Sequence, residues 1–368
     1  MLQITRLALW YFLVALLAFG DVGGFAPSDG VTIVFDPPAS LGTIPRSINN
    51  NQVVTGDFLQ GDPIHGNVNH GFIRDANGTI TVFDPPNCHY NGDNGGFSIN
   101  DNGDVVGFFI EDPTFRFRGF VRKANGTFDV FGVDPYTDTI AMSINAGGDV
   151  TGYTLGSPIR GFLRESNGTI TPFDVGSGGY TLGLSINDSG DILGTYIDSD
   201  RSSHAFVRTR AGKVFKIVTP SPLLSVSNIN AQGFVAGSWL DDSTTGQSTG
   251  FLWDRLQGAV PLKIRPKMSF ISLVQVNSIG EITGFFTATD PRGIPSIVRP
   301  ERPSIPSTQQ EFFLKTTTGK DILLFSPGEF STEVYLGFND LGAAAGYGFG
   351  SDGVPHGLIR IAILKPGH

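Results

Sequence analysis

The segment SINDNGDVVG at residues 98–107 contains the residue types of a cation-binding loop. Four asparagine and aspartate side chains surround Gly103, and carboxylate and amide oxygens are the ligands that Ca²⁺ prefers. The same residue types also favour a tight hairpin turn, because Asn, Asp and Gly adopt the left-handed backbone at low steric cost. Related segments can separate the two interpretations, since a metal site must keep its charge whereas a turn must keep its Asn and Gly.

Six further copies of this segment occur along the chain, four of them close and two weaker. A glycine stands seven residues after the central asparagine in every copy, whereas the acidic residues are missing from most copies. The pattern therefore predicts a structural turn in each copy, and it predicts neither a metal nor another cofactor. The asparagines assigned to these turns are Asn49, Asn100, Asn145, Asn187, Asn230, Asn277 and Asn339.

Three other strings contain reactive residues but lack the context that their chemistry needs. Residues 246–250 (GQSTG) match a nucleophile elbow and residues 348–353 (GFGSDG) match a dinucleotide loop, yet both motifs require a following helix that the pattern does not predict. Residues 87–90 (NCHY), with His65 and His70 nearby, could bind a transition metal, but the simpler interpretation is an inert loop. No catalytic residue is assigned from these strings.

Each copy of the opening segment belongs to a longer repeat unit. The unit also contains a segment such as GFVR (119–122) and, in three units, Asn-Gly-Thr followed by a short run that ends in Phe. It therefore has four short runs separated by Gly and Asn, and no window has helical periodicity. A unit of four short strands that recurs about every 40 to 50 residues is typical of a β-propeller blade. The phenylalanines at one repeated position are expected to pack between blades: Phe72, Phe120, Phe162, Phe206 and Phe251.

The two ends of the chain complement each other. The last unit ends soon after its third strand, and residues 28–38 match the fourth-strand segment at 76–86 position by position. The sequence therefore predicts an all-β, seven-bladed β-propeller of four-stranded blades. We expect the N-terminal strand 31–35 to complete the last blade and to close the ring.

The sixth unit is irregular. A single propeller domain is expected over residues 28–364, with an insertion at about 300–312. The third strand of the sixth blade could be either 296–299, which resembles GFVR, or 312–315.

The N-terminus has the features of an export signal. Arg6 precedes the apolar run Leu7–Phe19, which is shorter than the roughly 20 residues that a membrane span needs. Residues 1–20 are therefore interpreted as a signal peptide, and the mature chain is expected to be a secreted or periplasmic monomer without stable membrane insertion. Cys88 is the one cysteine, so no internal disulfide can form, and a net charge of −9 argues against nucleic acid as a partner.

The succession of GFVR, NGT and SIN..GDVVG segments, with His204-Ala-Phe206 in the fourth unit, resembles the HAF-family extracellular repeats of bacteria. The likeness extends over roughly residues 28–362. The histidine of the HAF triplet is assigned only in the fourth unit, at His204, so the resemblance depends on the whole repeat. It implies a secreted, propeller-like repeat protein, and it implies no particular reaction.

Loop variability predicts where a ligand would bind. In up-and-down blades the first-to-second and third-to-fourth turns lie on one face, which we call the regular face because its turns repeat. The second-to-third loops and the connections between blades lie on the opposite, variable face, where they differ in every unit. Binding residues usually lie on such loops. The ligand contacts expected on the variable face are Tyr90, Arg116, Tyr136, Tyr180, Arg201 and Trp239.

Two functions fit these observations. The favoured one is a binding or interaction scaffold for an extracellular or cell-envelope partner, such as a glycan or a peptide. The alternative is an exported hydrolase or lyase with carboxylates around the central channel, for which Asp112, Asp198 and Asp241 are the candidates. Convergence of these carboxylates at the channel mouth would favour the enzyme.

Overall fold

The computed structural model describes residues 30–89, 94–222, 224–241, 247–262, 268–288, 310–315, 321–324, 330 and 333–362. The expected signal peptide at residues 1–20 and Tyr90 lie outside these residues. The described part of the chain forms strands, turns and loops, and it contains no helix that could cross a membrane.

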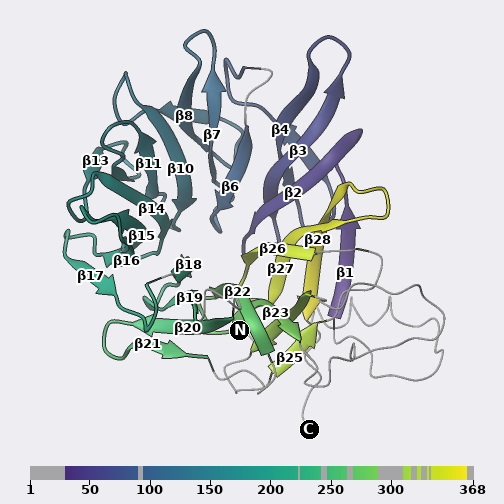
Figure 1. Cartoon of the computed structure of the whole chain (residues 1–368). Helices are drawn as coiled ribbons and strands as arrows, with labels where there is room; N and C mark the ends of the chain where they lie inside the picture. The colour runs from purple at the N-terminus through teal and green to yellow at the C-terminus, as the bar shows by residue number, and fades with distance from the viewer. Residues whose placement is uncertain are drawn as a thin grey trace, which may run out of the picture.

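The strands form seven four-stranded sheets around a ring (Figure 1), with antiparallel neighbours within each sheet. Six sheets each contain four strands that are consecutive in sequence. These six sheets are β2 (Ser40–Ile48), β3 (Val54–Asp62), β4 (Gly66–Arg74), β5 (Ile80–Phe83); β6 (Gly95–Ile99), β7 (Val105–Glu111), β8 (Arg116–Arg122), β9 (Phe128–Phe131); β10 (Asp138–Ile144), β11 (Val150–Leu155), β12 (Gly161–Arg164), β13 (Ile170–Phe173); β14 (Tyr180–Ile186), β15 (Ile192–Ile197), β16 (Ser203–Arg208), β17 (Val214–Ile217); β18 (Leu224–Ile229), β19 (Val235–Leu240), β20 (Ser248–Asp254), β21 (Gly258–Pro261); and β22 (Met268–Val276), β23 (Ile282–Ala288), β24 (Gln310–Lys315), β25 (Asp321–Leu324).

The seventh sheet joins the two ends of the chain. It contains β26 (Glu333–Phe338), β27 (Ala343–Phe349) and β28 (Pro355–Ala362), and its outer strand is β1 (Gly30–Phe35). In Figure 1 the purple β1 lies beside the yellow β28. The closing strand is one residue longer than the expected 31–35, because Gly30 pairs with Ala362 at its start.

The sixth sheet decides between the two expected third strands. Its third strand is β24, which pairs with both β23 and β25, so the resemblance of residues 296–299 to GFVR was misleading. The expected insertion at about 300–312 lies outside the described residues except for residues 310–312, which belong to β24. Strand pairing gives the reason: Phe313 lies opposite Gly284, as Phe120 lies opposite Gly107 in the second sheet. FFLK at 312–315 therefore occupies the place of GFVR, with a lysine at the position of the arginine.

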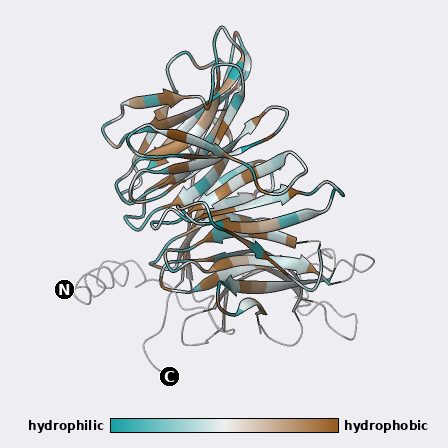
Figure 2. Ribbon diagram, turned by 90° about the vertical axis from the view of Figure 1, so that its left-hand side faces the viewer, coloured by the Kyte–Doolittle hydropathy of each residue, from teal (hydrophilic) through white to brown (hydrophobic). Residues whose placement is uncertain are grey.

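The core lies between adjacent sheets. The side chains of the repeated phenylalanines are fully buried, which confirms the expected packing, and each belongs to an apolar cluster or ring contact with a neighbouring blade: Phe72, Phe120, Phe162, Phe206 and Phe251. Figure 2 shows hydrophobic residues concentrated in the strands and hydrophilic residues in the connecting loops. Burial of each such ring contributes roughly 2 kcal/mol or more to the stability.

A small residue in the third strand makes room for the last residue of the fourth. Gly119 lies opposite Phe131, and a Cβ atom on Gly119 would come within 2.6 Å of that ring. In the fourth blade Ala205 takes the place of the glycine, and the opposite residue is Ile217 instead of a phenylalanine. The two positions therefore change together, since the larger third-strand residue requires a smaller partner.

Candidate functional site

The seven repeated asparagines form a closed ring of hydrogen bonds on the regular face. Each side-chain Nδ2 donates to the backbone carbonyl of the corresponding asparagine in the next blade, at 2.9–3.0 Å. Asn339 donates to Asn49 and thereby closes the ring. The Oδ1 atom of Asn100 also accepts the backbone N–H groups of Asn102 and Asp104, which fixes the turn. One buried side chain thus shapes its own turn and ties two blades together.

The serine of the repeated Ser-Ile-Asn triplet also joins neighbouring blades. Ser143 Oγ accepts the backbone N–H of Ile186 at 3.2 Å, and three other blade pairs have the same contact at 3.3–3.4 Å. The isoleucine between Ser and Asn is buried. All three residues of the triplet therefore hold the ring together.

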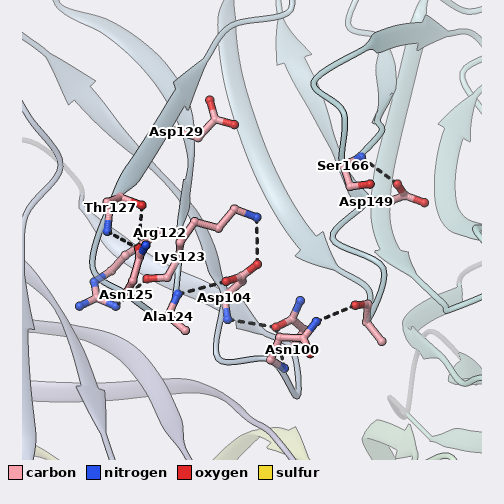
Figure 3. Close-up of polar contacts among 12 residues, drawn as sticks. Asn100, Asp104, Arg122, Lys123, Ala124, Asn125, Thr127, Asp129, Asp149 and Ser166 are labelled. Carbon is pink, nitrogen blue, oxygen red and sulfur yellow. Dashed lines mark hydrogen bonds and ion pairs between the residues drawn. The ribbon is translucent and has the colours of Figure 1, made fainter.

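The acidic residues of the opening segment bind protein groups. Asp104 accepts the Ala124 backbone N–H at 3.1 Å and pairs with Lys123 Nζ at 2.9 Å (Figure 3). In the next blade Asp149 accepts the Ser166 N–H and pairs with Arg210. Among the described residues no group of three or more His, Cys, Asp or Glu side chains could hold a metal ion. The acidic residues fasten the third-to-fourth turn to the first-to-second turn.

A shallow opening of about 190 Å³ lies inside the asparagine ring. Three aspartates stand around it, and each accepts a backbone N–H from the preceding blade at 2.7–2.9 Å. These are Asp101, Asp188 and Asp340. Their oxygens are thus used to join adjacent turns, as are those of Asp104 and Asp149.

The expected ligand contacts belong to several blades of the variable face. Arg116 begins β8 and pairs with Asp138 at 3.7 Å, and Tyr180 begins β14. Tyr136 lies between β9 and β10 and is 80% exposed, and Arg201 lies in the exposed β15–β16 loop. The structure does not bring these four side chains into contact with one another through any hydrogen bond or ion pair of the described residues. They mark one broad surface instead of a pocket.

Trp239 does not belong to that surface. Its side chain is buried, stacks on Phe251 with ring centroids 5.5 Å apart, and donates from Nε1 to Asp241 at 2.6 Å. The expectation of a ligand contact is wrong because Trp239 lies two residues after Gly237, as the core residue Phe109 lies two after Gly107.

Exposed apolar side chains on the variable face were not expected from the sequence. Ile64, Phe115 and Val218 are 84%, 64% and 76% exposed, and each lies in a loop of this face. Phe115 has a left-handed backbone with φ of 53°, a conformation that is costly for a phenylalanine. Its ring packs edge-on against His89 at 4.9 Å between centroids. The signal in the sequence was the apolar residue inside an otherwise polar, variable loop.

A histidine precedes the third-strand Gly-Phe, Ala-Phe or Gly-Leu pair in three units. His70, His204 and His356 occupy this place, and each pairs with an aspartate, at 3.0, 3.2 and 2.7 Å. The identification of His204 alone with the HAF position was therefore wrong. Arg160 occupies the same place in the third blade and pairs with Asp174 at 2.7 Å.

In the described part of the 87–90 segment, residues 87–89, no group of side chains could hold a metal ion. His89 pairs with Asp112 at 2.8 Å. Burial, and to a lesser degree the negative charges of Asp84 and Asp112, together raise the pKa of the Cys88 thiol to about 12. The thiol therefore stays protonated at neutral pH, which makes it a poor nucleophile and a poor metal ligand.

The carboxylates proposed for an enzyme do not converge. Asp112 and Asp198 pair with a histidine of the same face, and Asp241 accepts hydrogen bonds from Trp239 and Thr249. Each lies near the end of the second strand of a different blade. Of the two other catalytic-looking strings, residues 248–250 belong to β20 and residues 348–353 lie in the β27–β28 hairpin, and in the described residues no helix follows either of them.

Comparison with known proteins shows similarity of fold. No family model and no curated protein matches the chain. A streptogramin B lyase structure has a TM-score of 0.56 at 13% identity, over 92% of this chain and 100% of that chain. Puromycin hydrolase has a TM-score of 0.56 at 12% identity, over 92% of this chain and 55% of that chain. The β-propeller domain of the Trilobed protease from Pyrococcus furiosus, described as having an open velcro topology, has a TM-score of 0.52 at 8% identity, over 89% and 99%.

Proposed function

We propose that this protein is a binding or interaction protein whose ligand face is the variable face, and that its partner is a protein or peptide. The observation that carries this proposal is the set of apolar side chains that stand exposed on separate loops of this face: Ile64, Phe115, Tyr136 and Val218. Apolar and aromatic side chains are the usual anchors of protein interfaces.

The left-handed conformation of Phe115 supports the proposal. Folding holds this residue in a strained conformation although its ring is mostly in solvent. Backbone strain of this kind is concentrated at functional sites. The Glu111 carbonyl accepts the Phe115 N–H at 2.8 Å, so the loop itself fixes the ring in its outward position.

Export is part of the proposal. The apolar run Leu7–Phe19 after Arg6 and the resemblance to HAF-family repeats both favour a secreted or periplasmic protein. The other hypothesis is an exported hydrolase or lyase. The chain is similar in fold to a lyase and a hydrolase, but the carboxylates that an enzyme would require are dispersed over several blades.

The test is a screen of the chain from residue 21 onward against a peptide array and a glycan array. The hits are then measured with the variant Ile64→Ser/Tyr136→Ala/Val218→Ser. The matched control is Leu256→Ser/Ile279→Ser, which removes apolar side chains exposed on the regular face. We expect peptides that bind the wild type and the control, and that bind the variable-face variant at least about tenfold more weakly. Equal binding to all three proteins, or binding of glycans alone, would contradict the proposal.

A further inference from the structure

All five histidines in the described part of the chain lie on the variable face, and each pairs with an aspartate. The imidazole-to-carboxylate distances are between 2.7 and 3.2 Å. The pairs are His65–Asp62, His70–Asp84, His89–Asp112, His204–Asp198 and His356–Asp36. We call them the histidine–aspartate pairs.

The regular face uses different cations. Its carboxylates pair with Lys123, Arg164, Arg210 and Arg255, which stay charged throughout the physiological pH range. Arginine–carboxylate pairs also occur on the variable side, at Arg116, Arg118 and Arg160. The difference between the faces is that the described histidines are confined to one of them.

The surroundings of the pairs are mostly acidic. His356 lies between Asp36 of the β1 end and Asp352 of the β27–β28 loop, with the Phe330 ring nearby. His65 contacts Asp62 of its own loop. His89 contacts Asp112 after β7 and the ring of Phe115, and Cys88 beside it stays neutral.

The two remaining histidines stand beside an aromatic ring of the second strand. His70 lies against Phe58, and its partner Asp84 also accepts the side-chain amide of Asn94. His204 stacks on Tyr196, with Asp198 as its partner. Asp200 in the same loop interacts with His204. Two permanent cations lie near this pair: Lys216 on β17, whose Nζ lies over the Tyr196 ring, and Arg201, whose backbone N–H donates to the Asp198 carbonyl at 2.9 Å.

The charge of these pairs depends on pH. An imidazole is neutral at pH values well above its ordinary pKa of about 6.5 and cationic below it. A protonated histidine compensates the negative charge of its aspartate partner, whereas a neutral histidine leaves that charge available to a ligand. The aspartate side chains of the five pairs are 27% to 43% exposed, so an approaching ligand can reach them.

We propose that the variable face binds a basic peptide segment, whose lysine or arginine side chains contact the aspartates of the histidine–aspartate pairs, and that protonation of the histidines releases it. The inference rests on the proposed function, because it specifies the chemistry of the partner at that face. Exposed apolar side chains between the pairs suit a segment in which basic and apolar residues alternate.

Binding of an oligolysine peptide, with oligoglutamate as the opposite-charge control, tests the inference. We expect oligolysine to bind at about pH 7.5 and to bind about tenfold more weakly at about pH 5.5, because the histidines then compete for the carboxylates. The variant Asp84→Asn/Asp112→Asn/Asp198→Asn should lose binding at both pH values. The variant His70→Gln/His89→Gln/His204→Gln should keep most of its binding at the lower pH. Circular dichroism and thermal melting establish that each variant is folded.

The matched control is Asp101→Asn/Asp188→Asn/Asp340→Asn, which removes the same charge from the regular face. It should bind oligolysine as the wild type does. Equal affinity at both pH values, or absence of binding, overturns the inference but leaves the proposed function intact if array peptides still require the variable-face apolar residues. A loss of binding in the regular-face control that equals the loss in the variable-face variant would overturn both proposals.

Discussion

The regular and variable faces of the ring use similar polar residues for different purposes. On the regular face, Asn and Asp side chains bind backbone groups of neighbouring turns and blades, as Asn100 and Asp104 do. On the variable face, carboxylates pair with nearby cations, many of them histidines, and apolar side chains such as Ile64 stand in solvent between them. In this chain the repeated Ser, Asn and Asp residues tie neighbouring turns and blades together, whereas the loops that depart from the repeat form the variable face, to which the proposals above assign the partner.

Breaking the asparagine ring should have the largest effect on stability. Asn145→Ala removes the hydrogen bond to the Asn187 carbonyl and leaves the Asp149 N–H without its side-chain acceptor, in a buried place. We expect a loss of about 3 kcal/mol in the free energy of unfolding, since buried groups would lose their partners. Denaturant unfolding measures this.

The control for this prediction is Asn167→Ala. Asn167 lies in the exposed third-to-fourth turn and its Oδ1 atom accepts the Thr169 N–H at 2.8 Å. We expect a loss of less than about 1 kcal/mol there. Similar losses for the two variants would show that the ring adds nothing beyond the local turn.

The pair between the two ends of the chain should make stability depend on pH. The hydrogen bond to Asp36, and to a lesser degree the interactions with Asp352, raise the pKa of His356 above its ordinary value. The folded chain therefore binds this proton more tightly than the unfolded chain. The stabilisation is complete below the unfolded pKa of about 6.5 and is lost as the pH rises through the higher folded pKa.

His356→Gln should accordingly lower the free energy of unfolding at about pH 5.5 by up to about 1 kcal/mol, and leave it unchanged at about pH 8.5. Thermal melts of the two proteins across this range measure the difference. A loss of stability that is larger at high pH would have the wrong sign for this account.

The sequence predicted most of the ring because the repeat residues act locally and at a fixed spacing. The turn asparagine, the glycine seven residues later and the third-strand phenylalanine all recur, and the structure places them in equivalent positions. The sequence left the third strand of the sixth blade open between 296–299 and 312–315, because Phe312 and Lys315 replace the glycine and arginine of GFVR. Only the pairing of β24 with β23 and β25 identifies that strand.

The variable face could be located from the sequence, but its contacts could not. His356 and Asp36 are 320 residues apart, and they meet only because β1 completes the last sheet. Trp239 was assigned to the ligand surface by its residue type, whereas its place in β19 puts it in the core. Phe115 is exposed in a loop in which its own backbone is left-handed, and residue propensities do not predict that conformation for a phenylalanine.

Tyr136→Ala should separate binding from stability on the variable face. The side chain is 80% exposed, and the local turn is held by Asp134, which accepts the backbone N–H groups of Tyr136 and Thr137. We expect a change of less than about 0.5 kcal/mol in the free energy of unfolding, together with weaker binding of the array peptides. A substantial loss of stability with unchanged binding would place Tyr136 among the structural residues.

The smallest effect is expected from Ca²⁺. Both carboxylates of the SINDNGDVVG segment already have protein partners: Asp101 binds the Asn50 amide groups, and Asp104 binds Lys123 and the Ala124 N–H. A cation would have to displace these contacts, so millimolar Ca²⁺ or its removal by a chelator should shift the Tm by less than about 1 °C. Differential scanning calorimetry with and without chelator measures the shift. If Ca²⁺ raised the Tm by several degrees, and if this rise disappeared in the variant Asp104→Asn, the segment would be a cation site and the regular face would also be a binding face.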